Sequence, residues 1–73
     1  MAERLRNRLR EMRAERDLTQ ASLAELVGVS RKTINTVEND VFVPSTLLAL
    51  KLARALGCPV EALFSIDEKG SDS

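Results

Sequence analysis

A short run of polar side chains between Ser30 and Asn39 is the part of the sequence best suited to chemistry. The run reads SRKTINTVEN and contains two large apolar residues, Ile34 and Val37. If these two face a core, a helical rotation of about 100° per residue turns most of the polar side chains outward. The side chains nearest the outward direction are Lys32, Asn35, Thr36 and Asn39, with Arg31 and Thr33 on the flanks.

This polar face could form hydrogen bonds with base edges in the major groove of DNA. Arginine and lysine pair with guanine there, and asparagine pairs with adenine. A helix that reads bases carries such groups near its N-terminus. The residues that supply them here are Arg31, Lys32, Asn35 and Thr36. Because a solvated surface helix is also polar, the neighbouring elements have to decide between the two interpretations.

The residues before this run form the scaffold that a base-reading helix requires. Ala24 is small enough for a second helix to cross close to it, and Gly28 permits the left-handed conformation of a short turn. Ser30 is a favourable N-cap for the next helix. The apolar residues that anchor the two helices are Leu23, Val27, Val29, Ile34 and Val37. Residues 20–39 are therefore predicted to form a helix-turn-helix.

Turn residues divide the whole chain into short helices. Gly28 and Gly57 are natural C-caps. The predicted helices cover residues 3–16, 19–27, 30–39, 45–57 and 59–64. Alternating β-branched residues occur only from Val41 to Val43, so no strand is expected. The prediction is an all-α, compact five-helix domain over residues 1–66, followed by a polar tail over residues 67–73 that is disordered or a linker.

Some apolar side chains are not accounted for by the predicted core, both in the helix over residues 45–57 and in the loop before it. Leu47 and Leu50 add to an inward stripe that is already complete, which suggests a homodimer interface, with Phe64 as a further contact. Extended core packing is the alternative for each of them. Phe42 lies in a loop, where packing beneath the flanking helices is favoured over a partner surface. The first helix has an apolar stripe at Leu5, Leu9 and Met12, and its arginines resemble a solvated face.

Charge permits a nucleic-acid partner without indicating one. The net charge of the 73 residues is zero. Residues 1–39 carry eight basic and six acidic side chains, whereas residues 40–73 carry three and five. Phosphate binding usually shows as a larger basic excess.

Composition excludes several classes of protein. The chain has no histidine, no glycine-rich phosphate loop and one cysteine, so we expect no enzyme, no metal site and no cofactor. Cys58 lies at a helix junction and is interpreted as structural. No apolar run approaches the ~20 residues of a membrane span, and the N-terminus lacks a signal core. We therefore expect a cytoplasmic protein without a membrane partner.

Residues 5–64 resemble the Cro and lambda-repressor type of helix-turn-helix domain, the XRE family. Three stretches carry the resemblance: LRNRLREMRAERDLTQ, ASLAELVGVSRKTINTVEN and VPSTLLALKLARALGCPVEALF. The Thr19-Gln20 and Glu38-Asn39 pairs are also typical of that family. The resemblance implies a lambda-repressor-like DNA-binding domain of five helices, with the helix-turn-helix at the second and third.

The resemblance also implies roles for individual residues. Gln20 would contact a phosphate and brace a side chain of the recognition helix, and Asn39 would meet a phosphate. The positions that match base contacts are Arg31, Lys32 and Thr36. The full set of predicted DNA-binding residues is Gln20, Ser30, Arg31, Lys32, Thr33, Asn35, Thr36 and Asn39.

Two further positions follow from the resemblance. Arg13 and Glu38 match a pair that forms a salt bridge between the first and third helices. Asp40 departs from the family pattern, because glycine is usual there. Asp40 would have to adopt a left-handed conformation, and its charge would lie near DNA phosphates.

The sequence therefore predicts a regulator that binds double-stranded DNA sequence-specifically. The expected mode is a repressor that occupies a palindromic operator as a homodimer, with its two recognition helices one DNA turn (~34 Å) apart. Activation by contact with polymerase is the other mode that the residues allow. The alternative is a protein-interaction module, such as an antitoxin or accessory subunit, built on the same fold.

Overall fold

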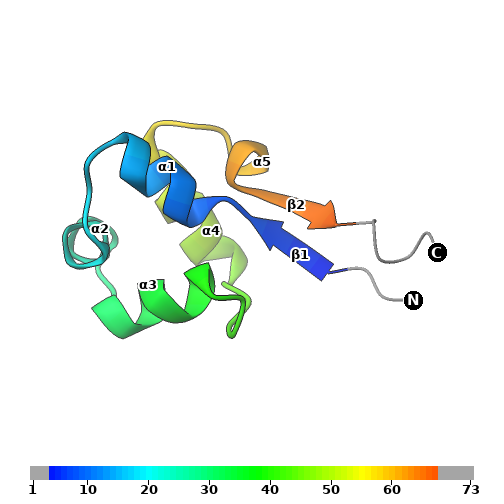
Figure 1. The fold of residues 1–73 in the computed structure, drawn as a ribbon, viewed down its shortest axis with the longest axis horizontal. Coiled ribbons are helices and arrows are strands. Elements are labelled where there is room, and N and C mark those ends of the chain that lie inside the picture. The colour runs from blue at the N-terminus through cyan, green and yellow to red at the C-terminus, as the bar shows by residue number, and fades with distance from the viewer. Residues whose placement is uncertain (1–3, 68–73) are drawn as a thin grey trace.

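A computed structural model describes residues 4–67 of the chain, and this part forms five helices and a two-stranded sheet (Figure 1). The elements in chain order are β1 (Arg4–Asn7), α1 (Leu9–Glu15), α2 (Gln20–Val27), α3 (Arg31–Glu38), α4 (Thr46–Leu56), α5 (Val60–Leu63) and β2 (Phe64–Asp67). The prediction of a small five-helix domain is confirmed. The prediction that it contains no strand is wrong.

The two strands come from opposite ends of the described chain and pair antiparallel (Figure 1). Arg4 lies opposite Asp67, and Asn7 lies opposite Phe64. The first helix was predicted to begin at residue 3 but begins at Leu9, because residues 4–7 form strand hydrogen bonds instead. Asp67, placed in the predicted tail, is the last residue of β2, and residues 68–73 of that tail lie outside the described residues.

The beginning of α1 is set by two hydrogen bonds at the end of β1. The backbone N–H of Arg8 donates to the carbonyl of Leu63 at 2.9 Å, which extends the pairing by one residue. The side-chain Oδ1 of Asn7 then accepts the N–H of Leu9 at 3.2 Å. Leu5, predicted to continue the apolar stripe of the helix, is 37% exposed in β1.

The caps predicted at Ser30, Gly28 and Gly57 are confirmed, and Thr19 and Ser45 are N-caps as well. The hydroxyls of Thr19, Ser30 and Ser45 each accept a backbone N–H at the start of α2, α3 and α4. Gly28 and Gly57 end α2 and α4 in the left-handed conformation, with φ of 76° and 68°. A residue with a Cβ is strained there, which explains glycine at both positions.

One hydrophobic core joins the five helices. Its buried residues are Leu9, Met12, Leu23, Ala24, Val27, Ile34, Val37, Leu48, Leu52, Ala53, Leu56 and Leu63. The inward stripes predicted for α2, α3 and α4 are therefore confirmed. Cys58 is half-buried and packs against this core.

The loop between α3 and α4 does not pack as predicted. Val41, Phe42 and Val43 are 74%, 47% and 70% exposed, so the expectation that they lie beneath the helices is wrong. The reason is in the backbone, because the N–H groups of Val41 and Phe42 both donate to the carbonyl of Thr36, at 2.9 and 3.2 Å. These bonds fold the loop back along α3 and leave its side chains outside.

Candidate nucleic-acid interface

The turn between α2 and α3 is held by the residues that the sequence singled out. The N–H groups of Gly28 and Val29 both donate to the carbonyl of Ala24, at 2.9 and 3.0 Å. Ala24 is 3% exposed, and its small side chain lets the two helices approach closely. Ser30 then caps α3 by accepting the N–H of Thr33 at 3.1 Å. The predicted helix-turn-helix is present over residues 20–38.

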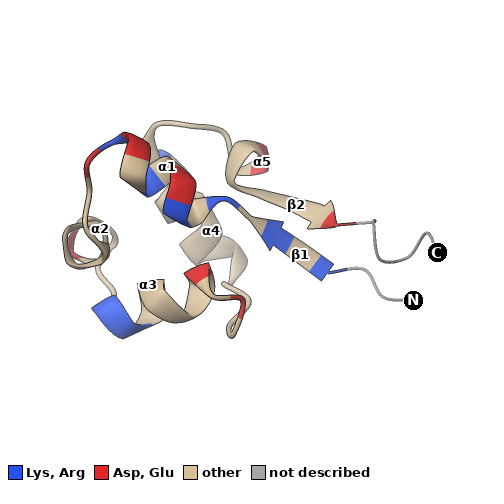
Figure 2. Cartoon of the chain, viewed as in Figure 1, with Lys and Arg blue, Asp and Glu red and all other residues tan. Residues whose placement is uncertain are grey.

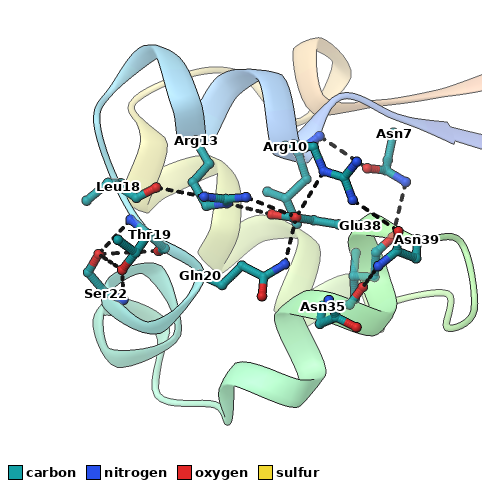
Figure 3. Close-up of polar contacts among 12 residues, drawn as sticks. Asn7, Arg10, Arg13, Leu18, Thr19, Gln20, Ser22, Asn35, Glu38 and Asn39 are labelled. Carbon is teal, nitrogen blue, oxygen red and sulfur yellow. Dashed lines mark hydrogen bonds and ion pairs between the residues drawn. The ribbon is translucent and has the colours of Figure 1, made fainter.

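Glu38, at the end of α3, is fixed by Arg13 of α1 (Figure 3). The carboxylate is fully buried and accepts Nε of Arg13 at 2.7 Å and Nη2 at 3.2 Å. Arg13 also donates Nη1 to the carbonyl of Leu18 at 2.9 Å, just before α2. The predicted salt bridge is therefore confirmed, and it is bidentate, which fixes both side chains in direction as well as in distance.

Two more side chains converge on the same carboxylate (Figure 3). Nε2 of Gln20 donates to Oε1 of Glu38 at 3.0 Å, so Gln20 does brace a side chain of α3. Nε of Arg10 lies 3.5 Å from the same oxygen. One buried carboxylate thus ties α1 and the start of α2 to the end of α3.

The charge states of this cluster follow from its contacts. Burial disfavours the charged form of Glu38, but hydrogen bonds from Arg13 and Gln20, together with the charge of Arg13, outweigh it and lower the pKa. The hydrogen bond to Glu38 raises the pKa of Arg13 against an opposing effect of burial. Both groups are therefore charged at neutral pH, and α3 is held by an ion pair.

The sequence did not predict tertiary roles for Arg10 and Arg16, which were interpreted as part of a solvated face. Arg10 donates Nη2 to Oδ1 of Asn39 at 3.0 Å, and Arg16 donates Nε to the carbonyl of Leu56 at 2.6 Å. The signal was their spacing, because Arg10, Arg13 and Arg16 recur every three residues along α1 and its C-cap, which places neighbouring members only about 60° apart around the helix.

Four predicted DNA-binding side chains lie together at the start of the unit. They line one shallow groove of about 330 Å³ and are Gln20, Arg31, Lys32 and Asn35. Arg31, Lys32 and Asn35 are exposed. Within residues 4–67, no hydrogen bond or ion pair engages the side-chain nitrogens of these three residues. Their donors are available to a ligand that enters the groove.

The other four predicted residues have polar atoms engaged within the protein. Ser30 caps α3, and its hydroxyl lies 3.0 Å from that of Thr33. Thr36 donates its hydroxyl proton to the carbonyl of Thr33 at 2.9 Å. Asn39 donates Nδ2 to the carbonyl of Asn35 at 2.9 Å and accepts Arg10 through Oδ1. The side-chain polar groups of these four residues are therefore less available to DNA than those of Arg31, Lys32 and Asn35.

Charge is unevenly distributed along α3 (Figure 2). Basic residues Arg31 and Lys32 lie at its N-terminal end, and acidic residues Glu38 and Asp40 lie at or just beyond its C-terminal end. Asp40 has φ of 61°, so the left-handed conformation expected of it is confirmed. Its Oδ1 accepts Nδ2 of Asn7 at 2.7 Å, which ties the loop to β1.

No helix within residues 4–67 is long and apolar enough to cross a membrane. The same residues contain no group of three or more acidic, cysteine or histidine side chains that could hold a metal ion.

Known proteins resemble this chain in sequence and in structure. A family profile described as helix-turn-helix matches residues 9–63. An HTH-type transcriptional regulator of Methanothermobacter thermautotrophicus, described as uncharacterized, is 47% identical over 68 residues, which are 92% of this chain and 99% of that protein. The cryptic phage CTXphi transcriptional repressor RstR of Vibrio cholerae is 33% identical over 66 residues, covering 90% of this chain and 60% of that protein.

A solved structure agrees with these matches. The restriction-modification controller protein C.AhdI from Aeromonas hydrophila superposes with a TM-score of 0.72 at 39% identity, over 74% of this chain and 82% of that one. The family profile covers the core, the helix-turn-helix and α4 together. The protein therefore belongs to the XRE-type family of helix-turn-helix transcriptional regulators.

Proposed function

We propose that the protein binds a specific double-stranded DNA sequence and represses transcription as a homodimer on a palindromic operator. The observation that carries the proposal is the rigid placement of α3. Glu38 ties the end of this helix to Arg13 and Gln20, while Arg31 and Lys32 stay exposed at its start. A recognition helix needs both a fixed position and vacant donors.

The proposed contacts follow from the groove at the start of α3. Arg31 and Lys32 supply donors for guanine or phosphate, and Asn35 can pair with adenine through its amide. Nε2 of Gln20 is committed to Glu38, so its Oε1 and remaining N–H are what it can offer to DNA. Basic charge at one end of α3 orients that end toward the phosphates.

The repressor and dimer parts of the proposal have separate support. RstR, a relative at 33% identity, is named a transcriptional repressor, and a bound dimer that covers a promoter needs no catalytic step. Leu47 and Leu50 of α4 are 65% and 52% exposed, which suits a contact with a second copy. Phe64 is half-buried against the core, so it contributes less than the sequence suggested.

A protein-interaction module is the second candidate. The exposed apolar residues that favour it, Phe42 and Leu47 foremost, are Leu5, Leu26, Val41, Phe42, Val43, Leu47, Leu50 and Ile66. The net charge of zero favours it as well, since phosphate binding gains from a basic excess.

Binding to duplex DNA at two salt concentrations separates the candidates. We expect the full chain to bind random duplex weakly, to select a palindromic site from a random pool, and to lose affinity steeply from about 50 to 200 mM salt. Lys32→Ala should weaken binding and relax base preference, whereas Lys51→Ala removes the same charge from α4 and should change little. Absence of DNA binding at low salt would contradict the proposal.

Sedimentation of the free protein tests the dimer. Leu47→Glu with Leu50→Glu should give a monomer that still binds one half-site, because both side chains are exposed and the fold does not need them. Val43→Glu adds one such charge at an exposed residue outside α4 and should leave the dimer intact. A wild-type protein that is monomeric both free and on its selected site would contradict the homodimer.

A further inference from the structure

One edge of the small sheet is left unpaired. The sheet has two strands, and Figure 1 shows β2 along one side of β1 only. The N–H of Arg8 donates to the carbonyl of Leu63, so the hydrogen-bonded pairs of this antiparallel ladder fall at every second residue back from Arg8. Leu5 and Asn7 lie between those pairs, and their backbone N–H and C=O groups therefore point away from β2. In the described part of the chain, no hydrogen bond outside the sheet engages these backbone groups.

A groove runs beside this free edge. Its volume is about 470 Å³, within the range of ligand-binding sites, and every residue of β1 lines it. The loop after α3 contributes Phe42, Val43 and Pro44 to the same groove. Phe42 and Val43 are 47% and 70% exposed, so the groove has an apolar wall that the fold leaves uncovered.

The two faces of β1 differ in character. Alternate side chains of a strand point to opposite faces, so Leu5 and Asn7 share one face while Arg4 and Arg6 share the other. The face of Leu5 lies toward the groove, because the side chain of Asn7 donates to the carbonyl of Val37, another lining residue, at 3.1 Å. A strand added to this edge would therefore place every second side chain over the groove, beside Leu5.

Arg6 determines the charge of the other face. It is exposed, and no ion pair engages it in the part of the chain that the structure describes. The two carboxylates of the groove lie elsewhere, since Asp40 accepts Asn7 at 2.7 Å and Asp67 is opposite Arg4. On an added strand, the residue facing Arg6 would belong to a non-hydrogen-bonded pair, in which side chains lie closer together. An acidic side chain at that position gains from the opposite charge.

A second copy of β1 does not fit this edge. Antiparallel pairing about a two-fold axis keeps each side chain on its own face, so Arg6 would lie opposite an arginine of the other copy. Like charges directly opposite one another destabilise a sheet, and charged side chains on short edge strands prevent such pairing. The partner of this edge must therefore carry the complementary charge.

We propose that the free edge of β1 binds an extended segment of another protein, which adds as a third strand. The segment sets an acidic side chain opposite Arg6, between two apolar side chains that lie over the groove. Main-chain hydrogen bonds to Leu5 and Asn7 provide affinity in this mode, and the alternate side chains provide selectivity. The surface shares no residue with the groove of Arg31 and Lys32, so this binding function is additional to DNA binding.

Titration with short peptides tests the docking site. The probes are the synthetic peptides Thr-Val-Glu-Val-Thr and Thr-Val-Lys-Val-Thr, added to the isotope-labelled full chain and followed by NMR. We expect the glutamate peptide to bind about fivefold more tightly than the lysine peptide, the value of one cross-strand pair of opposite charge. Binding should slow the hydrogen exchange of the Leu5 and Asn7 amides and leave that of Arg6 unchanged, because the Arg6 amide already faces β2.

Three variants separate charge from backbone pairing. Arg6→Glu should reverse the preference, so that the lysine peptide binds about fivefold more tightly. Arg54→Glu makes the same change at an exposed residue of α4 and should keep the wild-type preference. Leu5→Pro removes one outward N–H and should weaken both peptides, since proline is tolerated on an edge strand where its N–H faces solvent. Melting temperatures equal to that of the wild type would confirm that the fold is unchanged, and Arg6→Glu carries the test if the proline variant does not fold.

The outcomes distinguish this inference from the proposed function, because the titration contains no DNA. Absence of binding by the glutamate peptide overturns the docking site, as does an unchanged preference in Arg6→Glu. Slowed exchange at amides other than those of Leu5 and Asn7 overturns the addition of a strand. An Arg6→Glu variant that loses only affinity for duplex DNA would assign Arg6 to phosphate contacts, and a Leu5→Pro variant that only turns a dimer into a monomer would assign the edge to a second copy. Both results overturn the proposal.

Discussion

Replacement of Glu38 by alanine should destabilise the domain more than any other single charge removal on α1 to α3. The carboxylate is fully buried. It accepts hydrogen bonds from Arg13 and Gln20 and forms an ion pair with Arg10. Removal of one member of a buried ion pair costs ~3–5 kcal/mol, because the other charge stays behind without its partner. The Arg13 side chain is 16% exposed and keeps its bond to the carbonyl of Leu18, so we expect the lower end, about 3 kcal/mol.

This cost corresponds to a large shift in melting temperature. For a domain of this size, each kcal/mol lowers the melting temperature by roughly 4–8 °C, so about 12–24 °C is expected. Chemical denaturation monitored by circular dichroism at pH 7 measures the free energy of unfolding directly. Glu25→Gln is the control, because Glu25 is exposed on α2 and the substitution removes the same charge. It should change stability by less than about 0.5 kcal/mol.

The stabilisation by Glu38 should also depend on pH in one direction. Because its pKa is lower in the folded chain than in the unfolded chain, the folded state binds fewer protons. The stabilisation is complete above the unfolded-state pKa of about 4.3 and is lost as pH falls through the folded-state pKa. Glu38→Gln should therefore converge on the wild type in acid. A constant difference in unfolding free energy from pH 7 to pH 3, or a Glu38→Ala variant as stable as the Glu25 control, would refute the reasoning.

Three other substitutions test local features of the helix-turn-helix. Gly28→Ala should cost about 1 kcal/mol of unfolding free energy, because φ is 76° while no atom lies within 4 Å of the added Cβ; an unchanged melting curve would show that the turn relaxes. Ser30→Ala should cost about 1 kcal/mol by removing the cap on the N–H of Thr33, and a Ser30→Asp variant of near wild-type stability would confirm capping as the cause. Asp40→Asn keeps an acceptor for Asn7 and tolerates φ of 61°, so the free energy of unfolding should not change. The substitution removes a negative charge, so affinity for duplex DNA at low salt should rise about threefold. Equal affinity would place Asp40 away from the phosphates.

The interior of the helix-turn-helix could be predicted from the sequence because its causes are local. Ser30 caps a residue three positions away, and Gly28 ends a helix through its own backbone conformation. Apolar spacing along α2 and α3 determined which side of each helix is buried, and Leu23 and Ile34 are indeed fully buried. The outward face of α3, with Arg31 and Lys32 exposed at its start, followed from the same periodicity.

The start of the chain shows where this reasoning fails. Leu5, Leu9 and Met12 have helical spacing, yet residues 4–7 form a strand. Their partners, residues 64–67, lie some sixty positions away, and a local pattern contains no information on such a pairing. Long-range hydrogen bonds outweighed a local preference for helix that is worth only fractions of a kcal/mol per residue.

By itself, the sequence determined that this protein is a small helical domain with a helix-turn-helix and a polar outward face on α3, because caps, turn glycines and apolar periodicity act over a few residues. The tertiary structure alone decided that the side chain braced by Gln20 is Glu38 and that Arg10 lies against the same carboxylate. It alone decided that Val41 and Phe42 lie exposed beside Thr36. The physical reason is that these outcomes depend on how separate helices approach one another, and composition and spacing along one chain segment do not specify that approach.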